Sequence, residues 1–120
     1  LPAAPDLEIY ILKPEPDEVK KWLEENLGEL INAEEDGNHI RWKHEDSVIV
    51  LTLKADGNFA SLWFKKNTTQ WLTDLECARS AHIALDTEIR CSVAEWSEST
   101  KDEQPAWVKL TRGIEKSFDW

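Results

Sequence analysis

Cysteine, methionine and long apolar runs are the scarce features of this sequence. Among its 120 residues are only two cysteines, too few for the disulfide framework of a small secreted domain. No apolar run approaches the roughly 20 residues of a membrane-spanning helix, and no basic segment leads into an apolar secretory signal. We therefore expect a cytoplasmic protein. Because methionine is absent, we also expect the natural start to lie outside this sequence, which leaves export open.

Basic residues are also few, since 14 lysines and arginines face 24 acidic residues and the net charge is −10. Residues 1–60 hold 14 acids and 6 bases and contribute −8, whereas residues 61–120 hold 10 acids and 8 bases and contribute −2. A surface of this sign repels nucleic-acid phosphates and anionic lipids, so we expect neither nucleic acid nor membrane as a partner. It attracts basic proteins, although the same charge also serves solubility alone.

The first half of the chain begins with a strand and a helix. A chain of this length fits one domain, which we place at 7–120 after a flexible segment at 1–6. Residues 7–12 (LEIYIL) form a short run of β-forming residues and predict a strand. A helix is predicted to start at Pro16, which suits a first turn, and to stop at Gly28, with apolar residues at helical spacing between them.

From residue 29 to 66, apolar and polar residues alternate, which predicts strands. Asp-Gly pairs at 36–37 and 56–57 predict hairpin turns in which both residues take positive φ. Each pair belongs to an Asp-Gly-Asn tripeptide, but a calcium loop would need further acids at alternating positions, so turns are the better interpretation. The run at 48–53 (VIVLTL) is apolar on both faces and predicts a central strand.

The last part of the chain predicts a second helix and more strands. Thr73 to Glu76 forms a capping box, which predicts a helix to about residue 85. A strand over 88–96, a polar loop over 97–105 and a closing hairpin around 112–113 follow. We thus predict an α+β domain: a single, mainly antiparallel sheet of about six to eight strands with two helices on one face. The expected order is β-α-β-β-β-β-α-β-β.

The segment 70–93 holds both cysteines and His82. Residues five apart on a helix lie about 140° apart around its axis, so Cys77 and His82 cannot form the pair that a nucleophilic cysteine needs. A zinc site needs four ligands, usually with a closely spaced cysteine pair, which is missing. We predict no catalytic residue, no metal and no cofactor, and a hydrogen-bonded histidine at the core edge. Whether Cys77 and Cys91 are two buried thiols or a disulfide stays open. The rise per residue of a helix and of a strand places both at a similar distance from the turn that joins the second helix to the next strand.

Seven tryptophans are the most unusual feature of the composition. Tryptophan anchors interfaces because its ring is apolar and its N–H is polar, and we expect about four of the seven in the core. Acidic residues beside exposed tryptophans would pair with the lysines and arginines of a partner, although those at 34–36 and 45–46 fall at opposite ends of one strand pair. The candidate binding residues are Glu34, Glu35, Asp36, Glu45 and Asp46 with Trp42, Trp63, Trp96 and Trp107, and one of Trp42 and Trp63 is expected on the uncovered sheet face.

One pattern spans the last third of the chain. A tryptophan and an acid open a helix, a strand carries an Ile-Arg-Cys run, and an acid-aromatic pair ends the closing hairpin. The residues are Trp71, Asp74, Ala78, Ile89, Arg90, Cys91, Asp119 and Trp120. This pattern resembles small acidic proteins from bacterial toxin–immunity loci. The resemblance implies a compact α+β protein that covers a toxin's active site and has no catalytic residues of its own.

The sequence therefore favours a non-enzymatic, acidic protein-binding module, such as an immunity or inhibitor protein that occludes a basic toxin or enzyme. One alternative is a small-ligand or carbohydrate-binding domain that uses exposed tryptophan rings. A second is an enzyme with a carboxylate of raised pKa in a closed cleft. A third is a homo-oligomeric structural subunit that pairs through the strand at 114–119, so that monomer and homodimer both fit the sequence.

Overall fold

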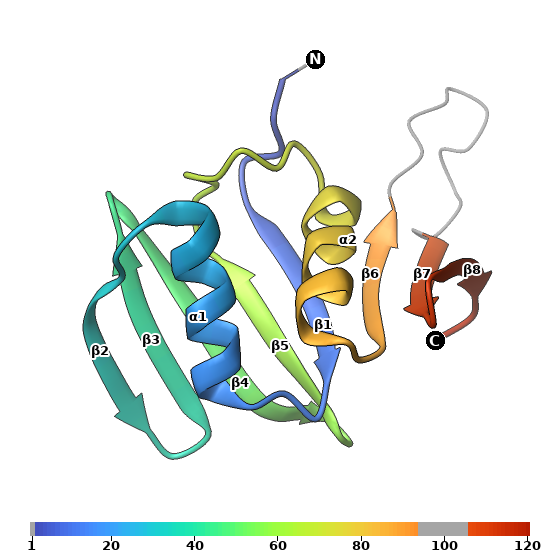
Figure 1. The fold of residues 1–120 in the computed structure, drawn as a ribbon, viewed down its shortest axis with the longest axis horizontal. Coiled ribbons are helices and arrows are strands. Elements are labelled where there is room, and N and C mark those ends of the chain that lie inside the picture. The colour runs from blue at the N-terminus through green and yellow to red at the C-terminus, as the bar shows by residue number, and fades with distance from the viewer. Residues whose placement is uncertain (1, 94–105) are drawn as a thin grey trace.

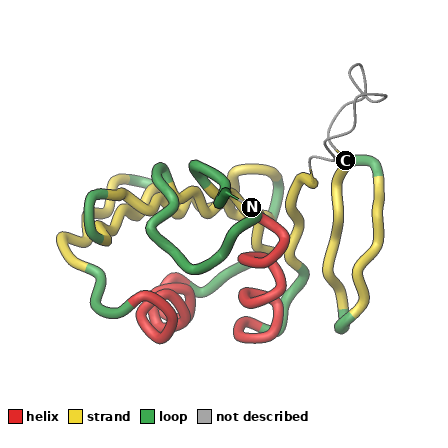
Figure 2. The backbone as a smooth tube through the Cα atoms, turned by 90° about the horizontal axis from the view of Figure 1, so that it is seen from above, coloured by secondary structure: helices red, strands yellow, loops and turns green. Residues whose placement is uncertain are grey.

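A computed structural model describes residues 2–93 and 106–120 and shows one open antiparallel sheet with two helices (Figure 1). The strand order is β2-β3-β4-β5-β1-β6-β7-β8, which places the first strand of the chain inside the sheet. Figure 2 shows both helices on the same side of the sheet. The elements are β1 (Leu7–Leu12), α1 (Pro16–Leu27), β2 (Ile31–Asp36), β3 (His39–His44), β4 (Ser47–Asp56), β5 (Phe59–Phe64), α2 (Asp74–Leu85), β6 (Ile89–Val93), β7 (Ala106–Thr111) and β8 (Ile114–Phe118).

The predicted α+β class is confirmed, with eight strands in the described part of the chain. The element order differs from the expected one, because three strands rather than two follow α2. Both arms of the closing hairpin join the sheet, β7 beside β6 and β8 beside β7. β4, predicted to be central, lies between β3 and β5. The loop predicted over 97–105 and the end of the strand predicted over 88–96 fall outside the described residues.

Both helices begin and end where their local sequences indicate. Pro16 occupies the first turn of α1, and the helix stops at Gly28, whose φ of 89° suits a residue without a side chain. Thr73 caps α2, because its side-chain oxygen accepts a hydrogen bond from the Glu76 backbone N–H. α2 ends at Asp86, which takes the left-handed conformation.

The hydrophobic core lies between the helices and the helix-facing side of the sheet. Strand alternation sends Leu7, Ile9 and Ile11 of β1 into it, and each fully buried side chain of this size contributes about 1.5–3 kcal/mol. The indole of Trp22 on α1 stacks on that of Trp71 with ring centroids 5.3 Å apart. The core also takes Val19, Leu23, Ile49, Leu51, Leu62, Phe64, Cys77, Ala78, Ala81, Ile89 and Cys91.

The hairpin turns form where predicted, but two of them use different residues at their centres. The β2–β3 turn is centred on Gly37 and Asn38, and only the glycine has positive φ. Asp36 instead pairs with His39 as the last residue of β2. The prediction that both residues of Asp-Gly take positive φ is therefore wrong here, and the turn at 57–58 repeats the difference.

The N-terminal segment, expected to be flexible, contacts the loop before α2. The backbone N–H of Ala4 donates to the carbonyl of Leu72 at 2.8 Å. The N–H of Asn67 donates to the carbonyl of Pro5 at 2.9 Å, and its side chain donates to the carbonyl of Ala4 at 3.1 Å. These bonds hold residues 4 and 5 against the domain.

Two strands carry register shifts that affect the surface. In β2, one extra residue lies between Ile31 and Glu34, and Asn32 takes positive φ. In β4, the register changes by two residues between Thr52 and Asp56. A shift of two keeps side chains on their original face, so Asp56 stays on the face that the helices leave uncovered.

Candidate binding surfaces

The sheet face away from the helices, here called the open face, is the main surface of the molecule without a covering layer. Residues directly opposite each other in an antiparallel pair point to the same face, so the register defines rows across the sheet. One row joins the acidic edge strand to an exposed tryptophan: Glu34, Arg41, Val50, Trp63 and Glu8. The next row is Asp36, His39, Thr52, Ser61, Tyr10, Arg90, Lys109 and Lys116.

Five aromatic side chains gather on the open face over β1 and β5 to β8. This aromatic cluster consists of Tyr10, Phe59, Trp107, Phe118 and Trp120. Trp120 is its centre, with ring centroids 5.0 Å from Tyr10, 4.9 Å from Trp107 and 5.4 Å from Phe59. These pairs meet edge to face at 84°, 79° and 62°, which is a favourable arrangement of aromatic quadrupoles.

A half-buried cation already lies within this cluster. The guanidinium of Arg90 lies 4.2 Å from the ring centroid of Phe59 and 4.7 Å from those of Phe118 and Trp120. Its Nε donates a 2.6 Å hydrogen bond to the Glu88 carboxylate, which neutralises it. Cation–π contacts gain strength when the cation is desolvated, so the cluster is a favourable environment for positive charge.

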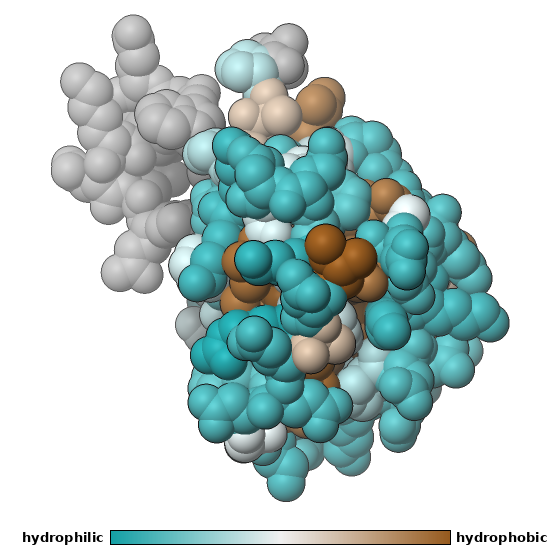
Figure 3. Space-filling model, turned by 90° about the vertical axis from the view of Figure 1, so that its left-hand side faces the viewer, coloured by the Kyte–Doolittle hydropathy of each residue, from teal (hydrophilic) through white to brown (hydrophobic). Residues whose placement is uncertain are grey.

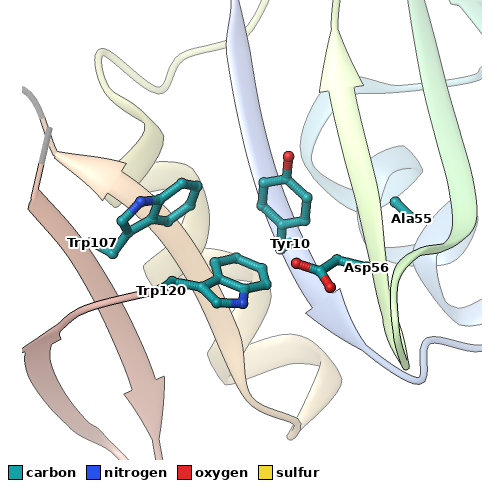
Figure 4. Close-up of a pocket in the computed structure, with 5 residues that line it drawn as sticks. All are labelled: Tyr10, Ala55, Asp56, Trp107 and Trp120. Carbon is teal, nitrogen blue, oxygen red and sulfur yellow. The ribbon is translucent and has the colours of Figure 1, made fainter. Parts of the chain in front are cut away.

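A cavity of about 280 Å³ opens beside the cluster, lined by Tyr10, Ala55, Asp56, Trp107 and Trp120. In Figure 4 the Asp56 carboxylate points from the β4–β5 hairpin toward the rings of Tyr10 and Trp120. We call this space the aromatic cavity. The Tyr10 hydroxyl donates to the Glu8 carboxylate at 3.4 Å. Burial, then the charge and hydrogen bond of Glu8, and then the charge of Asp56 raise the pKa of Tyr10.

One segment of the chain carries most of the net negative charge. Residues 15–36, which include α1 and β2, hold nine acidic residues and two lysines and thus contribute −7 of the net −10. We call this segment the acidic end. Arg41 and Lys43 of β3 offset part of the charge, so residues 15–44 carry −5. Figure 3 views this end and shows a mostly hydrophilic surface around a small hydrophobic patch. Ile31 of β2 is 50% exposed.

The structure separates the acidic residues that the sequence proposed. Glu34, Glu35 and Asp36 are exposed on the edge strand β2 within the acidic end. Glu45 and Asp46 lie in the turn at the other end of β3, about 20 Å away along a strand of this length. Asp46 contacts Lys66, and the hydrogen bond from this lysine lowers its pKa. The two groups therefore form two separate surface positions, as their order in the chain indicated.

The proposed tryptophans also separate. Trp42 is 3% exposed and lies in the core beside Ile40, so its assignment to a binding surface is wrong. The alternation Ile-Arg-Trp-Lys places Trp42 on the same face as Ile40, and the burial of both side chains shows that this is the helix-facing side of the sheet. Trp63 is 38% exposed on the open face, and its indole N–H donates to Asp6. Trp107 belongs to the aromatic cluster, and Trp96 lies outside the described residues.

A second cavity, of about 620 Å³, lies at the start of α2. The carboxylate of Asp74 lines it and accepts a 3.1 Å hydrogen bond from the Glu8 backbone N–H, which ties α2 to β1. Burial, with smaller contributions from the charges of Asp6 and Glu8, raises the pKa of Asp74 to about 6. This carboxyl can exchange a proton near neutral pH, a property that depends on tertiary contacts and has no local sequence signal.

The cysteines and His82 serve packing, as the sequence indicated. Cys77 and Cys91 are free and buried, and burial raises the pKa of Cys77 well above its usual value and that of Cys91 to about 12. Nδ1–H of His82 donates to the Thr87 carbonyl at 2.8 Å, and its Nε2 accepts from the Gly113 N–H at 2.9 Å. A thiol that stays protonated is a poor nucleophile, and an imidazole with both nitrogens engaged is not a free base.

Two features are absent from the described residues. No group of three or more potential ligands among histidine, cysteine, aspartate and glutamate lies close enough together to hold a metal ion. None of the described helices combines the length and apolar character needed to cross a membrane.

Comparisons of the chain with protein-family models, curated proteins and solved structures gave no match.

Proposed function

We propose that this chain is a non-enzymatic protein-binding module that docks a basic protein across its acidic end and the adjoining part of the open face. The immunity or inhibitor type, in which the bound module occludes a toxin or an enzyme, is the form of this function that we favour. The observation that carries the proposal is the −7 charge of residues 15–36, which include α1 and the edge strand β2, and β2 adjoins the open face.

The arrangement supports two roles that a docking surface needs. Exposed carboxylates at an edge, such as Glu34 and Asp36, raise the encounter rate with a positively charged surface and discriminate against acidic proteins. Trp63 lies in the same cross-strand row as Glu34, three strands inward, and offers a partly exposed ring as an anchor. Ile31 adds apolar contact area at the acidic end.

The test compares two variants that change the net charge equally. Glu34→Gln with Glu35→Gln removes two charges from the acidic end, and Asp86→Asn with Asp119→Asn removes two exposed charges elsewhere. The wild-type chain and both variants serve as baits for proteins from cells that produce the chain, at low and high salt.

We expect a basic protein that binds the wild type and the Asp86/Asp119 variant at low salt and binds the Glu34/Glu35 variant several-fold less. Its capture should weaken as salt rises, because screening removes the attraction between exposed charges. Capture that is equal for all three baits, or that brings no basic protein, would contradict the proposal.

The aromatic cavity favours a second candidate function, a small-ligand or carbohydrate-binding domain. Its rings and its single carboxylate form a recess of a size suited to one small group. Tryptophan fluorescence during a titration with a panel of sugars and small amines distinguishes this function from protein binding alone. Saturable quenching by a small ligand supports it, and unchanged emission with every ligand rejects it.

A further inference from the structure

The aromatic cavity combines three ring walls with one carboxylate. The rings of Tyr10, Trp107 and Trp120 meet pairwise at 65°, 84° and 79°, so their planes are close to mutually perpendicular. Asp56 supplies the acidic group that lines this space (Figure 4). Among the described side chains, no basic group forms an ion pair with the Asp56 carboxylate. The site therefore offers negative charge and electron-rich ring faces to a group that is not part of the described chain.

We propose that the aromatic cavity binds an alkylammonium group, with Tyr10, Trp107 and Trp120 as its aromatic walls and Asp56 as its counter-ion. Aromatic faces attract cations through the ring quadrupole, and tryptophan is the strongest of the three aromatic residues in this respect. A carboxylate at the rim adds Coulomb attraction and favours a positively charged ligand over a neutral ligand of the same shape.

The geometry favours a compact cation over a sugar. A sugar ring stacks in parallel on one broad aromatic face, whereas these three rings contact one another edge to face with centroids 4.9–5.9 Å apart, so the cavity lies beside them and meets ring edges and faces of different orientation. An anion is disfavoured because the charged group that lines the cavity is the Asp56 carboxylate. A rounded, positively charged head group satisfies both the perpendicular walls and the single carboxylate.

The surroundings of the cavity show that positive charge is tolerated there. Arg90 already lies over the ring of Trp120, and its charge is balanced by Glu88. Burial is the largest cause of the raised pKa of Tyr10, and the charges of Glu8 and Asp56 raise it further, so both carboxylates contribute negative potential at the cavity. The potential that holds the proton on this phenol also stabilises a bound cation.

Asp56 reaches this position because of the irregular end of β4. Two extra residues between Thr52 and Asp56 change the register against β5, and Lys54 within them takes positive φ. Asp56 then pairs with Phe59, a member of the aromatic cluster. The equivalent residue of the other Asp-Gly-Asn tripeptide, Asp36, pairs with His39 at the acidic end, far from any of these rings.

This site is separate from the acidic end, although Trp63, the proposed anchor, lies on β5 beside β1. β1, which carries Tyr10, is four strand positions from β2 in the sheet, which corresponds to about 19 Å at a spacing of ~4.8 Å. Binding of an alkylammonium group therefore neither requires nor excludes a basic protein at the acidic end, and the two proposals can fail independently.

The test titrates defined probes while two-dimensional ¹H–¹⁵N NMR monitors the tryptophan indole N–H signals at constant ionic strength. The probes are choline, its neutral isostere 3,3-dimethyl-1-butanol, Nα-acetyl-lysine methylamide and methyl glucopyranoside. Choline represents a free quaternary ammonium ion, and the lysine derivative represents the side chain of a protein, so their relative affinities identify the source of the group. Asp56→Asn removes the charge of the site, and Asp36→Asn is the matched control from the second tripeptide.

We expect choline or the lysine derivative to shift the indole signals of Trp107 and Trp120 saturably, with a dissociation constant of about 1–10 mM. Asp56→Asn should weaken this binding by about tenfold, and Asp36→Asn should leave it unchanged. Circular dichroism of both variants checks that the fold is kept.

Three results would overturn the proposal. Equal binding of 3,3-dimethyl-1-butanol would identify an apolar recess that does not recognise charge. Saturable shifts with methyl glucopyranoside instead of the amines would identify a sugar site. Absence of saturable shifts at these two tryptophans with either amine would show that the cavity binds neither form of the group.

Discussion

At the scale of single residues, Asp74 stands out because its environment raises the pKa of its carboxyl group toward neutral pH. Its pKa is raised from 3.8 to about 6, mainly by burial. The folded state therefore binds this proton more tightly than the unfolded state does between pH 4 and 6. Stability from this group falls as the pH rises through that window and is constant above it.

Asp74→Asn should accordingly stabilise the protein at pH 7–8, because the amide carries no charge and its oxygen still accepts the Glu8 N–H. The full shift corresponds to about 3 kcal/mol, and we expect about 1–2 kcal/mol after solvent screening of a partly exposed carboxyl. The gain should vanish below pH 4 in denaturant unfolding. Asp46→Asn is the control, since the pKa of Asp46 is lowered and its loss should bring no gain. A gain for Asp74→Asn that does not depend on pH would refute this assignment.

The two cysteines give a second prediction at this scale. Cys77 and Cys91 are buried and their thiol pKa values are raised. In the folded state each thiol therefore stays protonated and out of reach of a reagent in solution. Iodoacetamide should label neither residue in the native protein within the time that labels both in denaturant, as read by mass spectrometry. Rapid labelling of either thiol under native conditions would mean that the helix α2 side of the core is open.

At the scale of elements, His82 joins three segments: α2, the loop before β6 and the β7–β8 turn. Its ring donates to the Thr87 carbonyl and accepts from the Gly113 N–H, which requires the neutral ring with the proton on Nδ1.

His82→Ala should lower the free energy of unfolding by about 2 kcal/mol through two lost hydrogen bonds, and it should speed hydrogen exchange of the Gly113 amide. His39→Ala is the matched control, because its single side-chain bond to Thr52 is exposed and its loss should cost under about 0.5 kcal/mol. Similar costs for both variants, or an unchanged Gly113 amide, would show that the turn does not depend on His82.

The elements themselves could be predicted from local signals. Pro16 and Gly28 mark the limits of α1, and the Thr73 cap marks the start of α2. Alternation over β4 and β5 gave both strands, since period two follows directly from the pleat. The β2–β3 turn is centred on Gly37 and Asn38 and not on Asp36 and Gly37. The register of the flanking strands decides this, because it pairs Asp36 with His39 as the last residue of β2.

At the scale of the whole molecule, the candidate sites were less predictable than the fold. Trp63 and the acids of β2 follow from local pattern, whereas the aromatic cluster does not. Tyr10 and Trp120 meet there because β1 lies between β5 and β6, a strand order that reflects packing over long sequence separations. Asp56 was missed because the two-residue register shift in β4 decides that it pairs with Phe59 beside the aromatic cluster.

The central claim, that the acidic end steers a basic partner onto this module, is tested most directly by an association rate. For the partner captured by the wild-type chain, stopped-flow mixing gives this rate at about 20 mM and at about 0.5 M salt, where the Debye length falls from roughly 20 Å to 4 Å. We expect Glu34→Gln with Glu35→Gln to slow association by about three- to tenfold at low salt and by little at high salt, and Asp86→Asn with Asp119→Asn to have a smaller effect at both. Equal rates for the two variants at low salt would contradict the account.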